Sequence, residues 1–333
     1  MLKPIKNRVE IKVPVRADVA GAFSDIPYYL AKYNIGQGEV VNVALPAYLL
    51  VIIEAGRQID PITLEMPDMK EKIVGDLVDL AAQESNNASQ VASNFIRLFA
   101  LDSAGLKITI TSNGKIPPAS GLGTSSAVGV GLVRALSEMF GLKGINAPEF
   151  NYLIEQAMGV TGGKQDSYAS FLGGINHLKF WGPDRGMVSL VSHFDDNSKE
   201  NKWLLDHLLV YFSGESRSSG VANAKAEKRV KKDPKILTVL AKEAKNAFVA
   251  IEKMNIELLK RIVKRDRENW FELTDGNWYT PRLRELAKVG ENLGFEHRAG
   301  GAGAGGCLLF FGDPAKKKEL VSKLQKISGR IVY

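Results

Sequence analysis

The chain has 333 residues, of which 45% are hydrophobic and 24% charged, and its formal net charge is +7. Its single cysteine excludes a disulfide framework and a cysteine-based zinc site, and the lack of a long apolar run argues against a membrane-spanning helix. The first residues lack the apolar core of a signal peptide, so we expect a cytoplasmic protein.

Several partners would suit so basic a chain: nucleic acid, an acidic membrane surface or a small anionic substrate. The densest basic segment, 225–235, has interleaved acids at helical spacing and no aromatic residue on which a base could stack. We therefore expect a small anionic substrate, and neither nucleic acid nor membrane, as partner. The sequence leaves a homodimer open.

In chain order, the first half mixes strands and helices. Alternating or β-branched stretches predict strands at 8–15, 38–56, 106–114 and 173–181. Apolar residues at helical spacing predict helices at 70–100, 124–142 and 147–159.

The second half is richer in helices. Residues 203–214 predict a strand that enters a loop, and long helical stretches follow from 218 to 293. A strand at 307–311 and a helix at 315–328 end the chain. We expect an α+β protein with two lobes, residues 1–185 and 186–333.

The stretch "PPASGLGTSSA" (117–127) places glycines and hydroxyls where a helix begins. The first amides of a helix are unpaired and favour anions, so a phosphate can bind there. Gly121 and Gly123 allow close approach of the backbone, and the hydroxyls that follow offer oxygens to phosphate or metal. No lysine follows the second glycine, so this is not a Walker loop. A serine-capped helix is the alternative.

A second polar stretch, "GVTGGKQDSYAS" (159–170), carries Lys164 and Asp166. A carboxylate there can orient or deprotonate a substrate hydroxyl, while the lysine steadies developing charge. Glu155, eleven residues before Asp166 in the preceding helix, is able to share Mg²⁺ with a serine. For either acid alone, a surface salt bridge is the alternative.

The stretch "GGAGAGG" (300–306) contains the pattern GxGxxG. A dinucleotide fingerprint needs a helix after it, and here a strand follows, which excludes a dehydrogenase. A glycine loop that packs against a ligand or another loop remains. The polar set in "PVRADVAGAFSD" (14–25), at the end of a predicted strand, also indicates a site.

Taken together and in order, these stretches resemble the GHMP kinase family of galactokinase, homoserine kinase, mevalonate kinase and phosphomevalonate kinase. The stretch 14–25 is similar to P-x-R-x-N-x-x-G-x-x-T-D, and 117–127 to the ATP-phosphate loop P-x-x-x-G-L-G-S-S-A. The glycines of 300–306 are similar to the family's third motif. The resemblance implies ATP, Mg²⁺ and a two-lobed α+β fold. Its N-terminal lobe would have a β-α-β organisation like ribosomal protein S5, and its C-terminal lobe would be ferredoxin-like.

Within the family, "GGKQDSYASFLGG" and "YFSGESR" resemble the bacterial heptose 7-phosphate kinases. By this resemblance Asp166 is the catalytic acid and base, Lys164 assists it, and Ser125 and Glu155 hold Mg²⁺. The residues implied to line the ATP phosphates are Pro118, Gly121, Leu122, Gly123, Thr124, Ser125 and Ser126. Those implied to bind substrate are Arg16, Asp18, Asp25, Arg217 and Gly303.

The chain departs from the heptose kinases at "GAFSD" (21–25), where they have Gly-Gly-Gly-Thr-Asp. Phe23 would crowd a polyhydroxylated sugar and would suit a more apolar acceptor. A sugar-phosphate kinase ranks first. A mevalonate or mevalonate-phosphate kinase, for example a mevalonate 3-phosphate 5-kinase, is the alternative. A catalytically dead ligand sensor is a rival of another class, but it would not need Ser125, Glu155 and Asp166 together.

Overall fold

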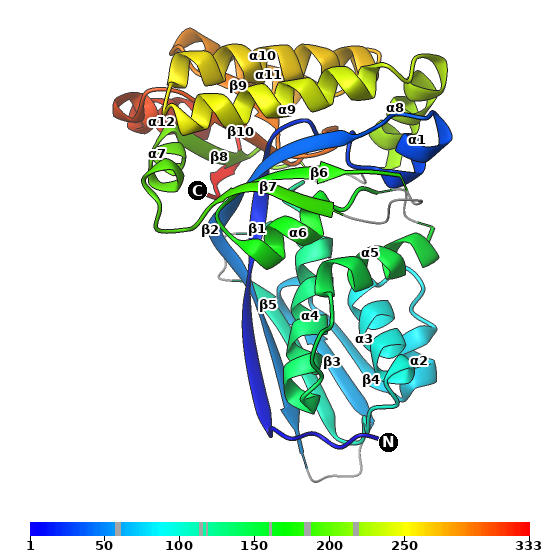
Figure 1. The fold of residues 1–333 in the computed structure, drawn as a ribbon. Coiled ribbons are helices and arrows are strands. Elements are labelled where there is room, and N and C mark those ends of the chain that lie inside the picture. Colours follow the sequence, from blue (N-terminus) through cyan, green and yellow to red (C-terminus); the bar gives the residue numbers. More distant parts are fainter. Residues whose placement is uncertain (57–60, 113–115, 118, 160–161, 183–187, 216–219) are drawn as a thin grey trace. The chain divides into compact units, whose positions relative to one another are not determined.

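The computed structural model describes residues 1–333 except 57–60, 113–115, 118, 160–161, 183–187 and 216–219 (Figure 1). The described chain forms two compact units. The first comprises Met1–Val15, Ala47–Ile116 and Thr124–Phe171; the second comprises Arg16–Pro46, Pro117–Gly123 and Leu172–Tyr333. The boundary near residue 185 stays a prediction. Within the described residues, every helix is too short or too polar to cross a membrane.

The first unit is a mixed sheet packed with helices. Its strands run in the order β4-β3-β5-β2, with β3 parallel to β5 and the other pairs antiparallel. Parts of β1 and β2 belong to it. The strands are β1 (Arg8–Ala20), β2 (Gly38–Ala55), β3 (Ile62–Met66), β4 (Glu71–Gly75) and β5 (Leu106–Ser112). The helices are α2 (Leu77–Ala81), α3 (Asn87–Leu98), α4 (Thr124–Phe140), α5 (Ala147–Ala157) and α6 (Gln165–Leu172).

Helix α4 is the central helix of this unit and packs against both α3 and α5 (Figure 1). Its sequence is apolar almost all round, and residues on several of its faces are buried. Gly131 lets α4 approach the sheet closely, because a Cβ there would lie 2.7 Å from a methyl of Val51 and 2.8 Å from one of Val13. Helix α4, whose first residues belong to the site described below, therefore packs tightly on this sheet.

The second unit contains two antiparallel groups of strands. The first half of β2 pairs with β6 (Ile175–Phe180), and β6 pairs with β7 (Val188–Phe194). The other group runs in the order β11-β8-β10-β9. Its strands are β8 (Leu208–Phe212), β9 (Glu296–Ala299), β10 (Cys307–Phe311) and β11 (Arg330–Ile331).

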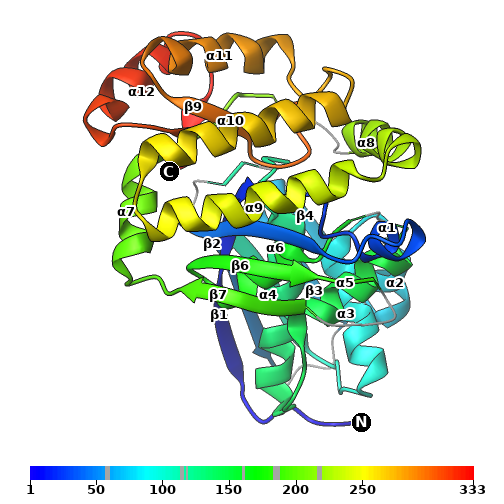
Figure 2. The same cartoon turned by 45° about the horizontal axis from the view of Figure 1, so that its top comes forward.

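The helices of the second unit enclose an aromatic core. They are α1 (Pro27–Lys32), α7 (Lys199–His207), α8 (Gly220–Lys232), α9 (Ile236–Glu252), α10 (Ile256–Leu273), α11 (Pro281–Asn292) and α12 (Lys317–Gln325). Helices α9 and α10 run side by side (Figure 2). The core gathers Trp270, Trp278, Tyr211 and Phe310 around the inner face of α10, and each is at most 2% exposed.

Most predicted elements are present, and three differences are informative. Residues 71–75 form strand β4, not helix, because all five pair with β3, and ladder hydrogen bonds prevail over helical spacing. Residues 203–207 belong to helix α7, and only then does the predicted strand begin, as β8. The glycine-rich stretch before Asp166 leads into a helix, α6, which the sequence pattern did not predict.

Candidate active site

In the first unit, the start of α4 carries a hydroxyl bound to a buried acid. Ser126 Oγ donates to Glu155 Oε1 at 3.0 Å, and the two residues are 6% and 7% exposed. Asn87, in the first turn of α3, donates its amide to the backbone oxygen of Ser125 at 2.9 Å. The hydroxyl that meets Glu155 is therefore that of Ser126, while Ser125, the predicted metal ligand, is exposed.

Glu155 is strongly perturbed by its surroundings. Burial raises its pKa from 4.5 to about 7; hydrogen bonds from Ser126 and Asn151 oppose the rise, and the charge of Asp166 adds to it. A carboxyl group in this state exchanges its proton near neutral pH. It is also suited to bind a cation, because a positive charge beside it would offset both the cost of burying the carboxylate and the repulsion from Asp166.

Asn151 joins the three helices that carry these groups. Its amide nitrogen donates to Ser167 Oγ on α6 at 3.0 Å. A Cβ at Gly129 of α4 would lie 1.6 Å from its oxygen, so only glycine fits there. Sequence reasoning missed Asn151, since an asparagine inside a helix gives no signal of its own. Asn151 of α5 therefore contacts both α4 and α6, the helices that carry Ser126 and Asp166.

Asp166 lies in the first turn of α6. Lys164, just before the helix, is 7% exposed and is tied down. Its ammonium lies 2.7 Å from Glu149 Oε2 and 4.9 Å from the centre of the Tyr152 ring. Tyr168 donates to the other oxygen of Glu149 at 2.7 Å. These contacts anchor the start of α6, and the catalytic roles of Lys164 and Asp166 stay predictions.

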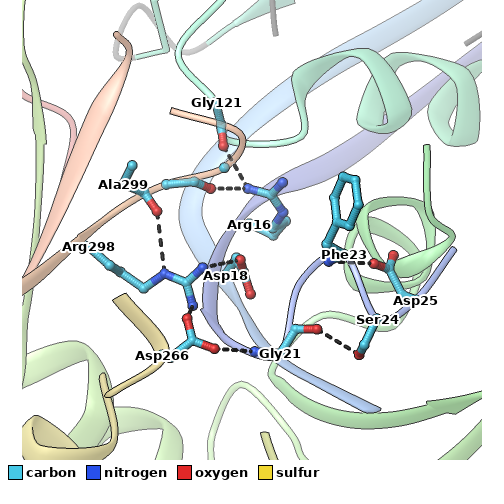
Figure 3. Close-up of polar contacts among 12 residues, drawn as sticks. Arg16, Asp18, Gly21, Phe23, Ser24, Asp25, Gly121, Asp266, Arg298 and Ala299 are labelled. Carbon is cyan, nitrogen blue, oxygen red and sulfur yellow. Dashed lines mark hydrogen bonds and ion pairs between the residues drawn. The ribbon is translucent and has the colours of Figure 1, made fainter. Parts of the chain in front are cut away.

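In the second unit, Arg16 joins two glycine loops. The residue is 5% exposed, and its Nη1 donates to the carbonyl oxygens of Gly121 at 2.7 Å and Gly300 at 2.6 Å (Figure 3). Its backbone nitrogen donates to the oxygen of Leu122, whose side chain is fully buried. The loop that leads into α4 therefore rests on the third glycine motif, with Arg16 between them. A substrate contact for Arg16 stays a prediction.

Gly303 is required by packing. Its φ is +72°, and a Cβ there would lie 2.2 Å from Trp278 Cδ1. Trp278 also donates its indole N–H to the oxygen of Gly301 at 3.2 Å and accepts from the nitrogen of Ala304 at 2.8 Å. The glycine loop 300–306 therefore packs closely against Trp278. A substrate contact for Gly303 stays a prediction.

The loop 21–25 is a compact turn at the end of β1. Gly21 N donates to Asp266 Oδ1 at 2.9 Å, and Phe23 N donates to Asp25 Oδ1 at 3.1 Å. The Ser24 hydroxyl donates back to the oxygen of Gly21 at 2.7 Å (Figure 3). Asp25 is thereby held by the backbone of its own loop, immediately before α1.

Phe23 was expected to lie in the substrate site, but its side chain is buried in the core. Its ring is in the aromatic core, 5.6 Å from the ring of Tyr29 and 5.8 Å from that of Trp270, and the residue is only 7% exposed. The expectation that Phe23 crowds a sugar is wrong for this conformation, because the side chain is used in packing.

Asp18 was predicted to bind substrate, but in the structure it forms an ion pair with Arg298. It is completely buried and paired with Arg298 at 2.6 Å, and the other end of the guanidinium lies 2.8 Å from Asp266 Oδ2 (Figure 3). Without exposed surface it cannot contact a substrate in this conformation. Sequence reasoning missed Arg298 and Asp266. Pro118 and Arg217, predicted to contact ATP and substrate, lie outside the described residues.

A phosphotransferase that acts on small molecules requires parts of the kind found in this chain. They are a helix N-terminus with a hydroxyl–carboxylate pair, a second acid on the next helix, and glycine loops. The family pattern for the GHMP kinase N-terminal domain matches residues 86–174, and that for the GHMP kinase C-terminal domain matches 247–329. The chain belongs to the GHMP kinase family and is an ATP-dependent phosphotransferase.

Relatives and solved structures agree with this assignment. The chain is 24% identical to the D-glycero-alpha-D-manno-heptose 7-phosphate kinase of Campylobacter jejuni, over 97% of this chain and 95% of that protein. It is 28% identical to the mevalonate kinase of Methanocaldococcus jannaschii, over 68% of each chain. A heptose 1-phosphate kinase structure from Bacteroides thetaiotaomicron superposes with a TM-score of 0.74 at 22% identity, covering 97% of this chain and 94% of that one. The predicted two-domain α+β fold is confirmed.

Proposed function

We propose that the enzyme transfers the γ-phosphoryl group of ATP to a hydroxyl of a small phosphorylated sugar of the heptose 7-phosphate type. A relative that matches this chain over nearly its whole length is named for that substrate. The observation that carries the proposal is the burial of Phe23 in the core, which removes the one local feature that argued against a sugar. A basic chain suits an anionic substrate.

The residues of the first unit would supply the chemistry. The free amides at the start of α4, with the hydroxyls of Thr124 and Ser126, would hold phosphate oxygens. Asp166 would orient the acceptor hydroxyl and take its proton. The transition state of phosphoryl transfer is loose, so alignment and charge neutralisation carry most of the catalysis.

Magnesium fits the donor set. Mg²⁺ uses one or two carboxylates and completes its shell with phosphate and water, and the buried Ser126–Glu155 pair offers oxygens of this kind. Glu155 would hold the ion, with a hydroxyl of the α4 start beside it. When bound, the ion would neutralise charge on the phosphates.

A second candidate is a mevalonate or mevalonate-phosphate kinase. It is favoured by the 28% identity to a mevalonate kinase over 68% of the chain. Both candidates share fold and motifs, and a fold alone does not choose a substrate.

The test measures ADP formation with ATP and Mg²⁺ across two panels of acceptors. One panel holds hexose and heptose phosphates beside the free sugars, and the other holds mevalonate and its monophosphates. We expect turnover with the sugar phosphates. Turnover with the mevalonate panel alone would overturn the proposal in favour of the second candidate. If ATP binds but no acceptor reacts, the proposal fails, and a ligand sensor becomes the hypothesis to test next. The Asp166→Asn variant, assayed in parallel, excludes a contaminating kinase.

A further inference from the structure

Three fully buried charged side chains meet behind the loop 21–25. Asp18 comes from β1, Asp266 from α10 and Arg298 from β9, and each is 0% exposed. Arg298 Nη2 lies 2.6 Å from Asp18 Oδ2, and Arg298 Nη1 lies 2.8 Å from Asp266 Oδ2. The guanidinium also lies over the ring of Trp278 at 5.7 Å. We call these three residues the buried triad.

Such a cluster is expensive to bury. Taking ions out of water costs several kcal/mol each, and apolar replacements of similar volume are often at least as stable. Two carboxylates share one guanidinium, so the triad is charge-balanced only when one carboxyl is protonated. Burial raises the pKa of Asp266 to about 6, against the opposing charge of Arg298. Stability alone is therefore a weak reason for its presence.

The triad reaches the loop through one backbone contact. Asp266 Oδ1 accepts from Gly21 N at 2.9 Å, while its Oδ2 faces Arg298. Gly21 is the first residue after β1 and has a φ of +90°. A Cβ at Gly21 would lie 2.2 Å from the oxygen of Glu39 and 2.6 Å from Ala244 Cβ, so the backbone has no room to shift on that side. Asp266 thus fixes the point from which the turn to Asp25 starts.

We infer that Asp266, held by Arg298, is a positioning residue for the acceptor-binding loop 21–25, and that it sets the affinity for the acceptor but not for ATP. This inference rests on the proposed function in so far as Asp25 binds the acceptor. The same guanidinium touches β1 through Asp18, two residues from Arg16. The triad therefore aligns the loop with the strand that carries it.

The structure offers a variant that should fold. Removing Asp266 leaves Arg298 paired with Asp18 in a neutral pair, so no buried charge is orphaned. Asp266→Asn keeps an oxygen that can accept from Gly21 N but loses the charge, and Asp266→Ala loses both. The matched control is Glu296→Gln. Glu296 lies on β9 two residues from Arg298, and its carboxylate is 2.7 Å from Arg267 in a separate ion pair.

The first readout is amide hydrogen exchange, measured by mass spectrometry on peptides that contain residues 20–26 of the full-length protein. We expect exchange in the loop to become about tenfold faster in Asp266→Ala, with a smaller change in Asp266→Asn and none in Glu296→Gln. The second readout is steady-state kinetics. KM for the acceptor should rise about tenfold in Asp266→Ala, while KM for ATP stays within about twofold of the wild type.

Loop exchange unchanged in both Asp266 variants would overturn the inference, and so would an equal rise in the two KM values. Should Asp266→Ala fail to fold, Asp266→Asn decides by the same two readouts. If no acceptor is turned over by the wild type, the proposed function fails, and the exchange rates alone then decide the role of the triad.

Discussion

Glu155→Gln should make the metal-free enzyme more stable at pH 8 while it abolishes turnover. Glu155 is 7% exposed, and its pKa is raised from 4.5 to about 7, mainly by burial. In the wild type at pH 8 the native state must hold this carboxylate ionised in a site that disfavours the charge. Glutamine keeps the oxygen that accepts from Ser126 Oγ, but it carries no charge.

The magnitude follows from proton linkage. The folded state holds the proton of Glu155 more tightly than the unfolded state does, so stability is full below pH 4.5 and falls as the pH rises through about 7. At about 1.4 kcal/mol for each pH unit between the two pKa values, the loss by pH 8 is roughly 3 kcal/mol. Glu155→Gln should recover most of this at pH 8, a rise in the thermal midpoint of roughly 5 °C, and almost none at pH 4.5.

The assay is denaturant unfolding of wild type and Glu155→Gln between pH 4.5 and 8, in EDTA. Glu138→Gln is the control, because Glu138 is an exposed acid on α4 that pairs with Lys6 at 2.8 Å; its effect should stay below about 1 kcal/mol at every pH. Mg²⁺ with ATP should then stabilise the wild type more than Glu155→Gln. If Glu155→Gln is no more stable than the wild type at pH 8, or if its advantage is the same at pH 4.5, the pKa of Glu155 is not raised in the folded protein.

Two further variants test other parts of the site. Asp166→Asn should lower kcat by about two to four decades while ATP binds with unchanged affinity in calorimetry; turnover near that of the wild type would exclude a proton-transfer role. Gly303→Ala should destabilise the protein by about 2 to 4 kcal/mol in chemical unfolding, because the new methyl meets Trp278 and the φ of +72° strains any side chain. If Gly303→Ala unfolds at the same denaturant concentration as the wild type, the loop can accommodate the methyl group without loss of stability.

The sequence predicts what short segments determine by themselves. The start of α4 was predicted within its motif because glycines and hydroxyls precede an apolar helix. Glu155 was predicted within a helix eleven residues before Asp166, and it does lie in a helix, α5; its metal-binding role stays a prediction. Helix periodicity and turn residues are local signals, and they are reliable where tertiary contacts agree with them.

The sequence does not indicate which residues far apart in the chain contact each other. Asp18 and Arg298 are 280 residues apart, and nothing near either residue indicates the other. The contact of Arg16 with Gly300 spans 284 residues. Phe23 was misjudged for the same reason: a bulky residue in a polar loop suggests a crowded site until the core that receives its ring is known. β4 was missed because its pairing with β3 is likewise invisible in a helical pattern.

Glu155 and Asp266 are both buried acids with raised pKa values, but the charges around them differ. Asp266 faces the cation of Arg298, which lowers its pKa, but burial and the charge of Asp18 outweigh that effect. The influences on Glu155 are burial, hydrogen bonds from Ser126 and Asn151, and the negative charge of Asp166; no basic side chain is among them. Asp266 therefore has a cationic partner within the protein, and its other oxygen accepts from the backbone nitrogen of Gly21. We propose that Glu155 instead gains a cationic partner when Mg²⁺ binds, which would connect this acid to phosphoryl transfer.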